Sequence, residues 1–335
     1  MTSKRKLDRR TALATMGISG LGLVAFRSEV LYGKPDDQGA PKPLTSLSDK
    51  SQLLLAAFLR SPEFSGQIPL ATVQQLAALE GKDVSNLMVA LLSSARNYSR
   101  PPISNYRVGA VARGLSGSLY LGMNVEIPGH SLGFSVHGEQ AALSSAYMHG
   151  ERGVSAISVT AAPCGHCRQF MNEMSLNGDI EIIVEGKSPL KLSSLLPMSF
   201  GPKDLGMADG ALPVRQTALA LLQDSADELT HAALEAARHA YAPYSGSYSG
   251  VAIAAKGQRT FKGSYIENAA FNPSLSPLQI ALVQLFLAGG DYSAIMRVVL
   301  VEMKDAKISQ ASVTKAVLST VAPKVELQTV YAVRK

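Results

Sequence analysis

The stretches that decide the fold are VHGEQAAL, residues 136–143, and PCGHC, residues 163–167, because each stands where the sequence changes to a helical pattern. Cysteines three positions apart at the start of a helix face the same way, so the thiolates of Cys164 and Cys167 can bind one ion. The N–H groups and the dipole of the helix start lower the pKa of the thiols and favour these thiolates. With the imidazole of His137, they predict a tetrahedral Zn2+ site with an open position for water.

Glu139 gives this predicted site a catalytic character. A structural zinc site usually takes all four ligands from the protein, whereas this one keeps a position open. A carboxylate two residues from the ligand His137 can stay off the metal, accept a proton from bound water and then donate it. A lone Cys-x-x-Cys pair is also typical of dithiol redox centres, and a lone His-x-Glu is common by chance, but their order along the chain favours catalysis. His166 stands two positions past Cys164, so we expect it on roughly the opposite face of the helix, beside the site or toward solvent.

Outward from these stretches the pattern alternates between strands and helices. Strand character begins at Arg107, and short amphipathic helices precede it. The expected strands are 108–115, 119–126, 157–162 and 180–184, and the expected helices are 48–59, 71–79, 84–98, 138–148 and one that opens at Pro163. This alternation predicts an α/β sandwich.

A second unit repeats the first and indicates a duplicated α/β module. At one constant offset, Pro243, Ser245, Gly250, Gly263 and Glu267 follow Pro102, Ser104, Gly109, Gly122 and Glu126. Farther on, the segment 279–282 resembles 140–143 after a small shift. The expected organisation is a leader and connector (1–43), an N-terminal helical segment (44–100), a catalytic zinc domain (101–186), a linker (187–215) and a second domain without zinc ligands (216–335).

The two copies differ where the chemistry would lie. Pro277 and Leu278 occupy the neighbourhood that corresponds to the histidine ligand, and no cysteine follows the strand expected over 297–301. We therefore expect the second copy to bind no zinc in this way. Its expected roles are to stabilise the fold, to form a dimer and to lend residues to the pocket, with Ala270 and Phe271 as candidates for the last role.

Composition limits the classes of function. The chain has 335 residues, of which 46% are hydrophobic, so it can bury a substantial core in two medium domains. Much of the excess in its net charge of +6 lies in the basic N-terminal residues, and no Lys/Arg stripe remains elsewhere, so no nucleic-acid partner is expected. With 2 cysteines in the chain, a disulfide framework is excluded.

The N-terminus has the form of an export leader. Basic residues over 4–10 precede an apolar run over 11–26, and Arg9 and Arg10 match the twin-arginine signal, which carries folded proteins. A membrane-tethering helix and a start codon assigned too far upstream are the alternatives. No other stretch is long and apolar enough to span a bilayer, so no stable membrane association is expected beyond this leader.

From about residue 45 to the C-terminus, the chain resembles the dimeric, two-domain cytidine deaminases of enteric bacteria. The stretches that carry the likeness are 104–106 (SNY), 136–143, 163–173, 200–205 (FGPKDL) and 267–273. His-x-Glu followed by Pro-Cys-x-x-Cys is also the signature of zinc nucleobase deaminases. The resemblance implies an α/β fold made of a duplicated three-layer module, with a mixed sheet flanked by helices, and a small N-terminal helical segment. It also implies a homodimer that hydrolytically deaminates free cytidine and 2′-deoxycytidine to uridine and 2′-deoxyuridine, releasing ammonia, in pyrimidine salvage.

The resemblance further implies contacts to the substrate. In that family, the residues that stand at Asn124 and Glu126 hydrogen-bond the ribose 3′-hydroxyl, the aromatic residue at Tyr106 packs on the pyrimidine, and a backbone carbonyl near Ala162 meets the amino group. An amide and a carboxylate two apart at a strand end project to one side, which suits a sugar hydroxyl. An ordinary polar turn and a core aromatic are the alternative interpretations. The chain departs from the family in carrying the small Ala161 and Ala162, which predicts a looser pocket without loss of activity, and Tyr106 where the family usually has Phe.

Two other functions stay open at this point. Deamination of a nucleotide or a polynucleotide would call for a phosphate cradle or for interleaved basic and aromatic residues, and the sequence shows neither. A non-catalytic, zinc-stabilised scaffold would not need Glu139. Location is also open, between the cytosol, as the resemblance implies, and export to the periplasm through the twin-arginine-like leader.

Overall fold

The computed structural model describes residues 47–61, 64–174 and 179–335. All of them belong to one compact unit, Gln38–Lys335. The predicted leader and connector over 1–43 lie outside the described residues. Within the described part of the chain, no helix is long and apolar enough to cross a membrane.

The described chain begins with helices. They are α1 (Asp49–Leu59), α2 (Leu70–Glu80), α3 (Val84–Ala90) and α4 (Leu92–Arg96), with the short strand β1 (Gln67–Ile68) before α2. The Asp83 side chain caps α3 by accepting a hydrogen bond from the backbone N–H of Asn86. The single helix predicted over 84–98 is wrong, because the chain turns at Leu91 between α3 and α4. There the hydroxyl of Ser93 donates to the Ala90 carbonyl at 3.3 Å and competes with regular helical pairing.

The first sheet has six strands in the order β1-β3-β2-β4-β5-β6. After β1 they are β2 (Gly109–Gly114), β3 (Leu119–Met123), β4 (Val154–Val159), β5 (Glu181–Val184) and β6 (Leu190–Lys191). β4 and β5 run parallel, and every other neighbouring pair is antiparallel. The sheet is therefore mixed, as predicted.

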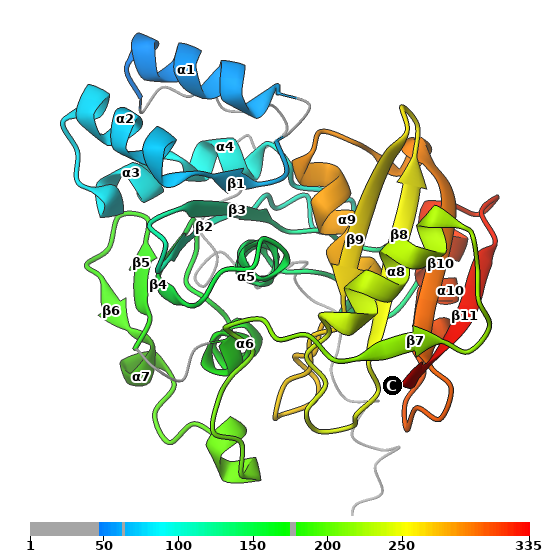
Figure 1. The fold of residues 1–335 in the computed structure, drawn as a ribbon. Coiled ribbons are helices and arrows are strands. Elements are labelled where there is room, and N and C mark those ends of the chain that lie inside the picture. Colours follow the sequence, from blue (N-terminus) through cyan, green and yellow to red (C-terminus); the bar gives the residue numbers. More distant parts are fainter. Residues whose placement is uncertain (1–46, 62–63, 175–178) are drawn as a thin grey trace, which may run out of the picture. The chain divides into compact units, whose positions relative to one another are not determined.

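Two glycines mark the two faces of this sheet. A Cβ on Gly109 would lie 2.5 Å from the Leu92 carbonyl oxygen of α4, whereas one on Gly122 would lie 2.2 Å from the Ala142 nitrogen of α5 (Gly138–Met148). Gly122 pairs with Ala110, the neighbour of Gly109, so the two glycines face opposite sides. Helices α4 and α5 therefore cover opposite faces and make three layers with the sheet (Figure 1).

The second module repeats this plan. Its strands are β7 (Leu219–Leu221), β8 (Ser249–Ala255), β9 (Arg259–Ser264), β10 (Ile295–Met303) and β11 (Leu327–Arg334), in the order β7-β11-β10-β8-β9, and β10 runs parallel to β11. Gly250 approaches α8 (Glu228–Arg238), and Gly263 approaches α9 (Pro277–Leu287). The last helix, α10 (Ala311–Val321), lies between β10 and β11 in the chain. The repeated glycines thus hold equivalent places, which confirms the predicted duplication.

A hydrophobic core runs through both modules. Its centre is formed by α5 and α9, which contact each other and are buried along most of their lengths. The segment 187–215, predicted as a linker, contains α7 (Leu192–Leu195) and the short 3-10 helix η3 (Pro202–Leu205). The two modules therefore share one core, in which α5 of the first module packs against α9 of the second.

Candidate metal and active site

The three predicted metal ligands meet where two helices begin. His137 is the N-cap of α5, Cys164 directly precedes α6 (Gly165–Met174), and Cys167 lies in the first turn of α6. The Nδ1 atom of His137 is 3.4 Å from Sγ of Cys164 and 3.3 Å from Sγ of Cys167. All three ligand atoms lie within 4.8 Å of one another, and no other such cluster occurs among the residues that the structure describes.

The sheet brings the two helix starts together. The start of α5 packs on β3, where a Cβ on Gly122 would lie 2.3 Å from the Gly138 carbonyl oxygen. Just past β4, Thr160 and Gly109 are tied by two hydrogen bonds: Thr160 N–H donates to the Gly109 carbonyl at 3.1 Å, and Gly109 N–H donates to Oγ1 of Thr160 at 3.3 Å. These bonds fix the connection from β4 toward Cys164 beside the start of α5.

The three ligand side chains share protons. The Cys167 thiol donates a hydrogen bond to Cys164 and, with the His137 imidazole, lowers the pKa of Cys164 to about 3 against the opposing effect of burial. The same bond to Cys164, together with burial, raises the pKa of Cys167. The hydrogen bond to Cys164 also raises the pKa of His137. A metal ion would displace these protons, so metal binding would release protons to solvent.

The donor set fits zinc, which takes imidazole and thiolate ligands in tetrahedral geometry. Three protein ligands leave the fourth position to water or substrate, which is the catalytic form of a zinc site. Glu139 lies two residues past His137 on α5 and is only 5% exposed. Burial raises the pKa of its carboxyl group. A carboxyl group with a raised pKa is suited both to accept and to donate a proton.

Asn124 and Tyr106, two of the predicted substrate residues, contact each other. The side-chain Oδ1 of Asn124 accepts a hydrogen bond from Val108 N–H at 2.9 Å, and its Nδ2 donates to the Tyr106 carbonyl at 2.8 Å. Tyr106 is half-buried, and Ala162 is exposed on the connection just before Pro163. Asn124 therefore holds the backbone of the loop that carries the predicted aromatic contact.

Glu126 holds the same loop from its other end. It accepts hydrogen bonds from the backbone N–H groups of Ile103 and Ser104, both at 2.9 Å. In the second module, Glu267 accepts from two successive backbone N–H groups in the same way, at 2.9 and 3.2 Å. This bonding is common to both modules and supports the loop. Glu126 also lies close enough to the metal ligands for its charge to contribute to the raised pKa of His137.

The starts of α5 and α9 correspond residue by residue. Ser276 is the N-cap of α9, as His137 is of α5, and Leu278 stands where α5 has Glu139. The sequence placed Pro277 and Leu278 only in the neighbourhood of the histidine. Leu278 is fully buried. The second module therefore keeps the helix and its cap but has neither the imidazole nor the carboxylate.

Sequence reasoning missed the contacts that the second module makes to the site. The Nε2 atom of Gln140 donates to the Pro273 carbonyl at 3.3 Å and also lies 3.3 Å from Nε2 of His166. The ring of His166 lies 5.7 Å from the ring of His137, so it is beside the site, one of the two places predicted for it. The match of 140–143 with 279–282 in the repeat was the sequence signal that could have drawn attention to Gln140.

Glu173, on α6, was missed as well. It is fully buried, and its carboxylate accepts hydrogen bonds from the hydroxyls of Tyr241 and Tyr244 and from the N–H of Ala269. Burial raises the pKa of this carboxyl group. All three donors belong to the second module, so Glu173 anchors the helix that carries Cys167. The segment containing the predicted Ala270 and Phe271 is therefore held beside α6.

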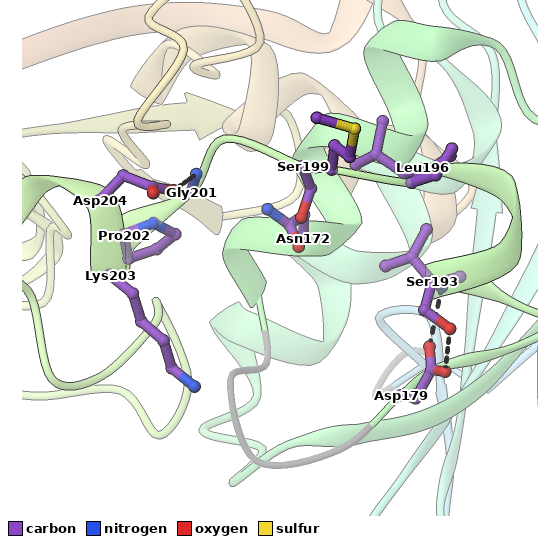
Figure 2. A pocket seen from close by; sticks show the side chains of 12 residues that line it. Asn172, Asp179, Ser193, Leu196, Ser199, Gly201, Pro202, Lys203 and Asp204 are labelled. Carbon is purple, nitrogen blue, oxygen red and sulfur yellow. Dashed lines mark hydrogen bonds between the residues drawn. The ribbon is translucent and has the colours of Figure 1, made fainter.

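A separate hollow of about 600 Å³ lies beside α6 and η3, and none of the predicted site residues lines it. Figure 2 shows Asn172 between Lys203 on one side and Asp179 on the other, with Asp179 hydrogen-bonded to Ser193. The hollow is widely open to the surface, and its acidic Asp179 is already bonded. The reactive groups lie in the cluster of His137, Cys164 and Cys167 and not in this hollow.

Comparison with known proteins agrees with this site. The family model described as cytidine and deoxycytidylate deaminase zinc-binding region matches residues 82–180, and a second model of the same description matches 192–315. The cytidine deaminase of Vibrio vulnificus (strain YJ016) is 42% identical over 280 residues, covering 84% of this chain and 94% of that protein. The cytidine deaminase of Salmonella newport (strain SL254) is 43% identical over 272 residues, covering 81% of this chain and 92% of that protein.

Solved structures of smaller proteins match part of the chain. The cytidine deaminase from Burkholderia pseudomallei is 32% identical, covers 34% of this chain and 97% of its own, and has a TM-score of 0.31. The cytidine deaminase from Mycobacterium tuberculosis is 28% identical, covers 35% of this chain and 96% of its own, and has a TM-score of 0.32. Each of these chains therefore spans about one third of the present one.

Proposed function

Since the chain belongs to the cytidine deaminases, and is thus a zinc enzyme that deaminates cytidine, we propose that His137, Cys164 and Cys167 hold its zinc ion and that Glu139 moves the protons. The observation that carries this proposal is the cluster of one imidazole and two thiols within 4.8 Å, beside a buried carboxyl group. The open fourth position of such a site is where water would bind.

The residues of the chain supply the proton transfers of the reaction. Zinc, when bound at these ligands, provides a water of lowered pKa that is a nucleophile near neutral pH. Glu139 accepts the proton that this water gives up and delivers it to ring N3, while hydroxide adds to C4 of the pyrimidine. Glu139 then takes the proton of the new C4 hydroxyl and passes it to the exocyclic nitrogen. The C4–N bond breaks as the C4=O bond forms, and ammonia leaves with uridine as the product. A carboxyl group with a raised pKa suits both transfers.

The test of this role is Glu139→Gln, which keeps the size of the side chain and removes its titration. We expect the zinc content and the melting temperature to stay close to those of the wild type, while kcat falls by about 10²- to 10⁴-fold because general acid–base catalysis is lost. Ultraviolet absorbance of cytidine follows turnover. Near-normal kcat in a zinc-loaded variant would remove Glu139 from the mechanism.

We propose that the substrates are free nucleosides, both cytidine and 2′-deoxycytidine. In this proposal Asn124 and Glu126 bond the ribose 3′-hydroxyl, Tyr106 packs on the base, and the Ala162 carbonyl accepts from the amino group. Asn124 supports this proposal because it is specific to the first module: the repeat has Tyr265 at the equivalent position. Glu126 is different, because Glu267 holds the equivalent loop of the second module in the same way.

A comparison of four substrates tests the nucleoside proposal. Cytidine, 2′-deoxycytidine, cytidine monophosphate and a cytosine-containing oligonucleotide are each offered at equal concentration to the full chain. We expect the two nucleosides to give the highest kcat/KM, because a phosphate group would lack a basic cradle. A higher kcat/KM for the monophosphate or the oligonucleotide would contradict the assignment.

We propose a homodimer as the working assembly. Large apolar side chains are exposed on the single chain; they include Met198, Phe200 and Leu205 of the segment 187–215, and Phe271. Where such side chains form one contiguous patch, the patch is typical of a surface that meets a partner. Sedimentation equilibrium should give twice the mass of the chain, and a monomer with full activity would contradict this assembly.

A further inference from the structure

The side chains of Gln140 and Gln279 occupy equivalent places at the starts of α5 and α9. The Oε1 atom of Gln279 accepts from the Ser276 N–H at 2.9 Å, and its Nε2 donates to the Phe134 carbonyl at 2.8 Å. The Oε1 atom of Gln140 accepts from the backbone N–H at the N-cap of α5 at 3.2 Å, and its Nε2 donates to the Pro273 carbonyl at 3.3 Å.

These bonds are reciprocal. Each glutamine caps its own helix and reaches across to the backbone that stands three residues before the N-cap of the other helix. Such exchange of equivalent contacts is the mark of a two-fold interface, here formed between two halves of one chain. Both side chains are buried, so each bond would leave an unsatisfied polar group if it were lost.

The pair differs in what the capped residue does. In α9 the capped residue is Ser276, whose hydroxyl turns back to accept from the N–H of Gln279. In α5 it is His137, whose imidazole is directed at the two cysteine thiols instead. The amide oxygen of Gln140 thus bonds the backbone of a proposed metal ligand, His137, and its amide nitrogen bonds the second module at Pro273.

We infer that Gln140 is a positioning residue that couples the second module to the metal centre through the backbone of His137. The inference rests on the proposed zinc ligands. By joining the His137 N–H to the Pro273 carbonyl, Gln140 sets the distance of the imidazole Nδ1 from the two thiols. The second module therefore shapes the reaction centre without supplying a ligand. Gln279 makes the equivalent bonds, but the N–H that it caps belongs to Ser276, which is no proposed ligand, and its bond to the first module ends on Phe134, three residues before His137.

The matched variants Gln140→Met and Gln279→Met test this inference in the full chain. Met has nearly the size of Gln and removes both bonds in each variant, so the melting temperature should fall in both; Gln140→Met also loses the contact to Nε2 of His166. Release of zinc to a chromogenic chelator and kcat for cytidine separate the two variants. We expect Gln140→Met to release zinc faster and to lower kcat, each by about 10- to 100-fold. KM should change little, because the proposed nucleoside contacts lie elsewhere. Gln279→Met leaves the His137 N–H bonded to Gln140 and loses only the contact to Phe134, so its zinc release and kcat should stay closer to the wild type than those of Gln140→Met.

Equal zinc release and equal kcat in the two variants would overturn the inference. If Gln140→Met does not fold, Gln140→Glu with Gln279→Glu takes its place, because Glu keeps the acceptor for the N-cap N–H and puts a carboxyl oxygen in place of the donor to the other module; both variants gain the same buried carboxyl group. Faster zinc release in Gln140→Glu alone is then the expected result, and equal release again overturns the inference. Zinc retained by a Cys164→Ser, Cys167→Ser double variant would instead show that the proposed ligands are wrong, which is a distinct outcome.

Discussion

The two modules have the same architecture and differ at the starts of two equivalent helices. Both have a glycine where each covering helix meets the sheet, a glutamate that holds the loop before the first long strand, and a capping glutamine. The first has His137 and Glu139 where the second has Ser276 and Leu278. The comparison teaches that the fold depends on close backbone approach and helix capping, and that the chemistry is added at a few positions without changing either.

The same difference has an energetic side. At the start of α9 the fully buried Leu278 fills its place with apolar contacts. At the start of α5 a carboxyl group takes that place, and its burial raises its pKa. A buried charge without a matching partner is unfavourable for folding. The first module therefore carries a destabilising group at the position of the proposed proton carrier, whereas the second has a leucine in an apolar core there.

The variants Glu126→Gln and Glu267→Gln should show the largest contrast between the modules. For Glu126→Gln we expect kcat/KM for cytidine to fall by about 10- to 100-fold, because the proposed charge-assisted hydrogen bond to the sugar hydroxyl would be lost. Glu267→Gln should leave kcat/KM unchanged, because it loses only the loop contact. Steady-state kinetics measure both, and an equal loss in the two variants would show that Glu126 acts only on the loop.

The variants Gly122→Ala and Gly263→Ala should have a smaller effect, on stability. The added Cβ would lie 2.2 Å from the Ala142 nitrogen in one and 2.1 Å from the Pro277 carbonyl oxygen in the other, so a helix must shift. We expect the free energy of unfolding to fall by about 1–3 kcal/mol in each. Only Gly122→Ala should also lose zinc, because α5 carries a ligand. Urea denaturation and metal analysis check this, and equal zinc content would mean that the start of α5 tolerates the shift.

The smallest effect concerns the buried anchor between the modules. Burial raises the pKa of Glu173 above the ordinary value of a glutamate carboxyl group. Because the native state then binds the proton more readily than the unfolded state, the stabilising contribution of this group is full below pH 4.5 and declines as pH rises through the native pKa. Glu173→Gln removes this titration.

As pH rises, the wild type should therefore lose stability relative to Glu173→Gln. The loss in its free energy of unfolding should be about 1.4 kcal/mol for each unit by which the pKa is shifted. Urea midpoints measured from pH 4.5 upward follow it. Parallel curves for the two proteins would show that Glu173 titrates alike in the native and unfolded states.

The sequence was informative where one local pattern determines the outcome. The helix predicted over 138–148 coincides with α5, and the spacing of His137, Cys164 and Cys167 was enough to predict the cluster that the structure brings together. The helical pattern over 84–98 was misleading, because the chain turns at Leu91 between α3 and α4. The hydrogen bond from the Ser93 hydroxyl to the Ala90 carbonyl at this turn is not visible in a hydrophobic pattern.

Contacts between distant segments were out of reach for a different reason. The bonds from Gln140 to Pro273 and from Ala269 to Glu173 depend on how two modules pack, and no periodicity within one segment encodes that packing. The repeat suggested which residues are equivalent, and it did not show that equivalent residues reach across to each other. The leader lies outside the described residues, so its export role stays a prediction.

The most direct test of the central claim, that one of two related modules is the reaction centre, is the number of zinc ions bound per chain. Metal analysis of the purified full chain should give a single zinc ion, and the Cys164→Ser, Cys167→Ser double variant should give none while the second module remains folded. Two zinc ions per chain, or zinc that persists in the double variant, would contradict the account.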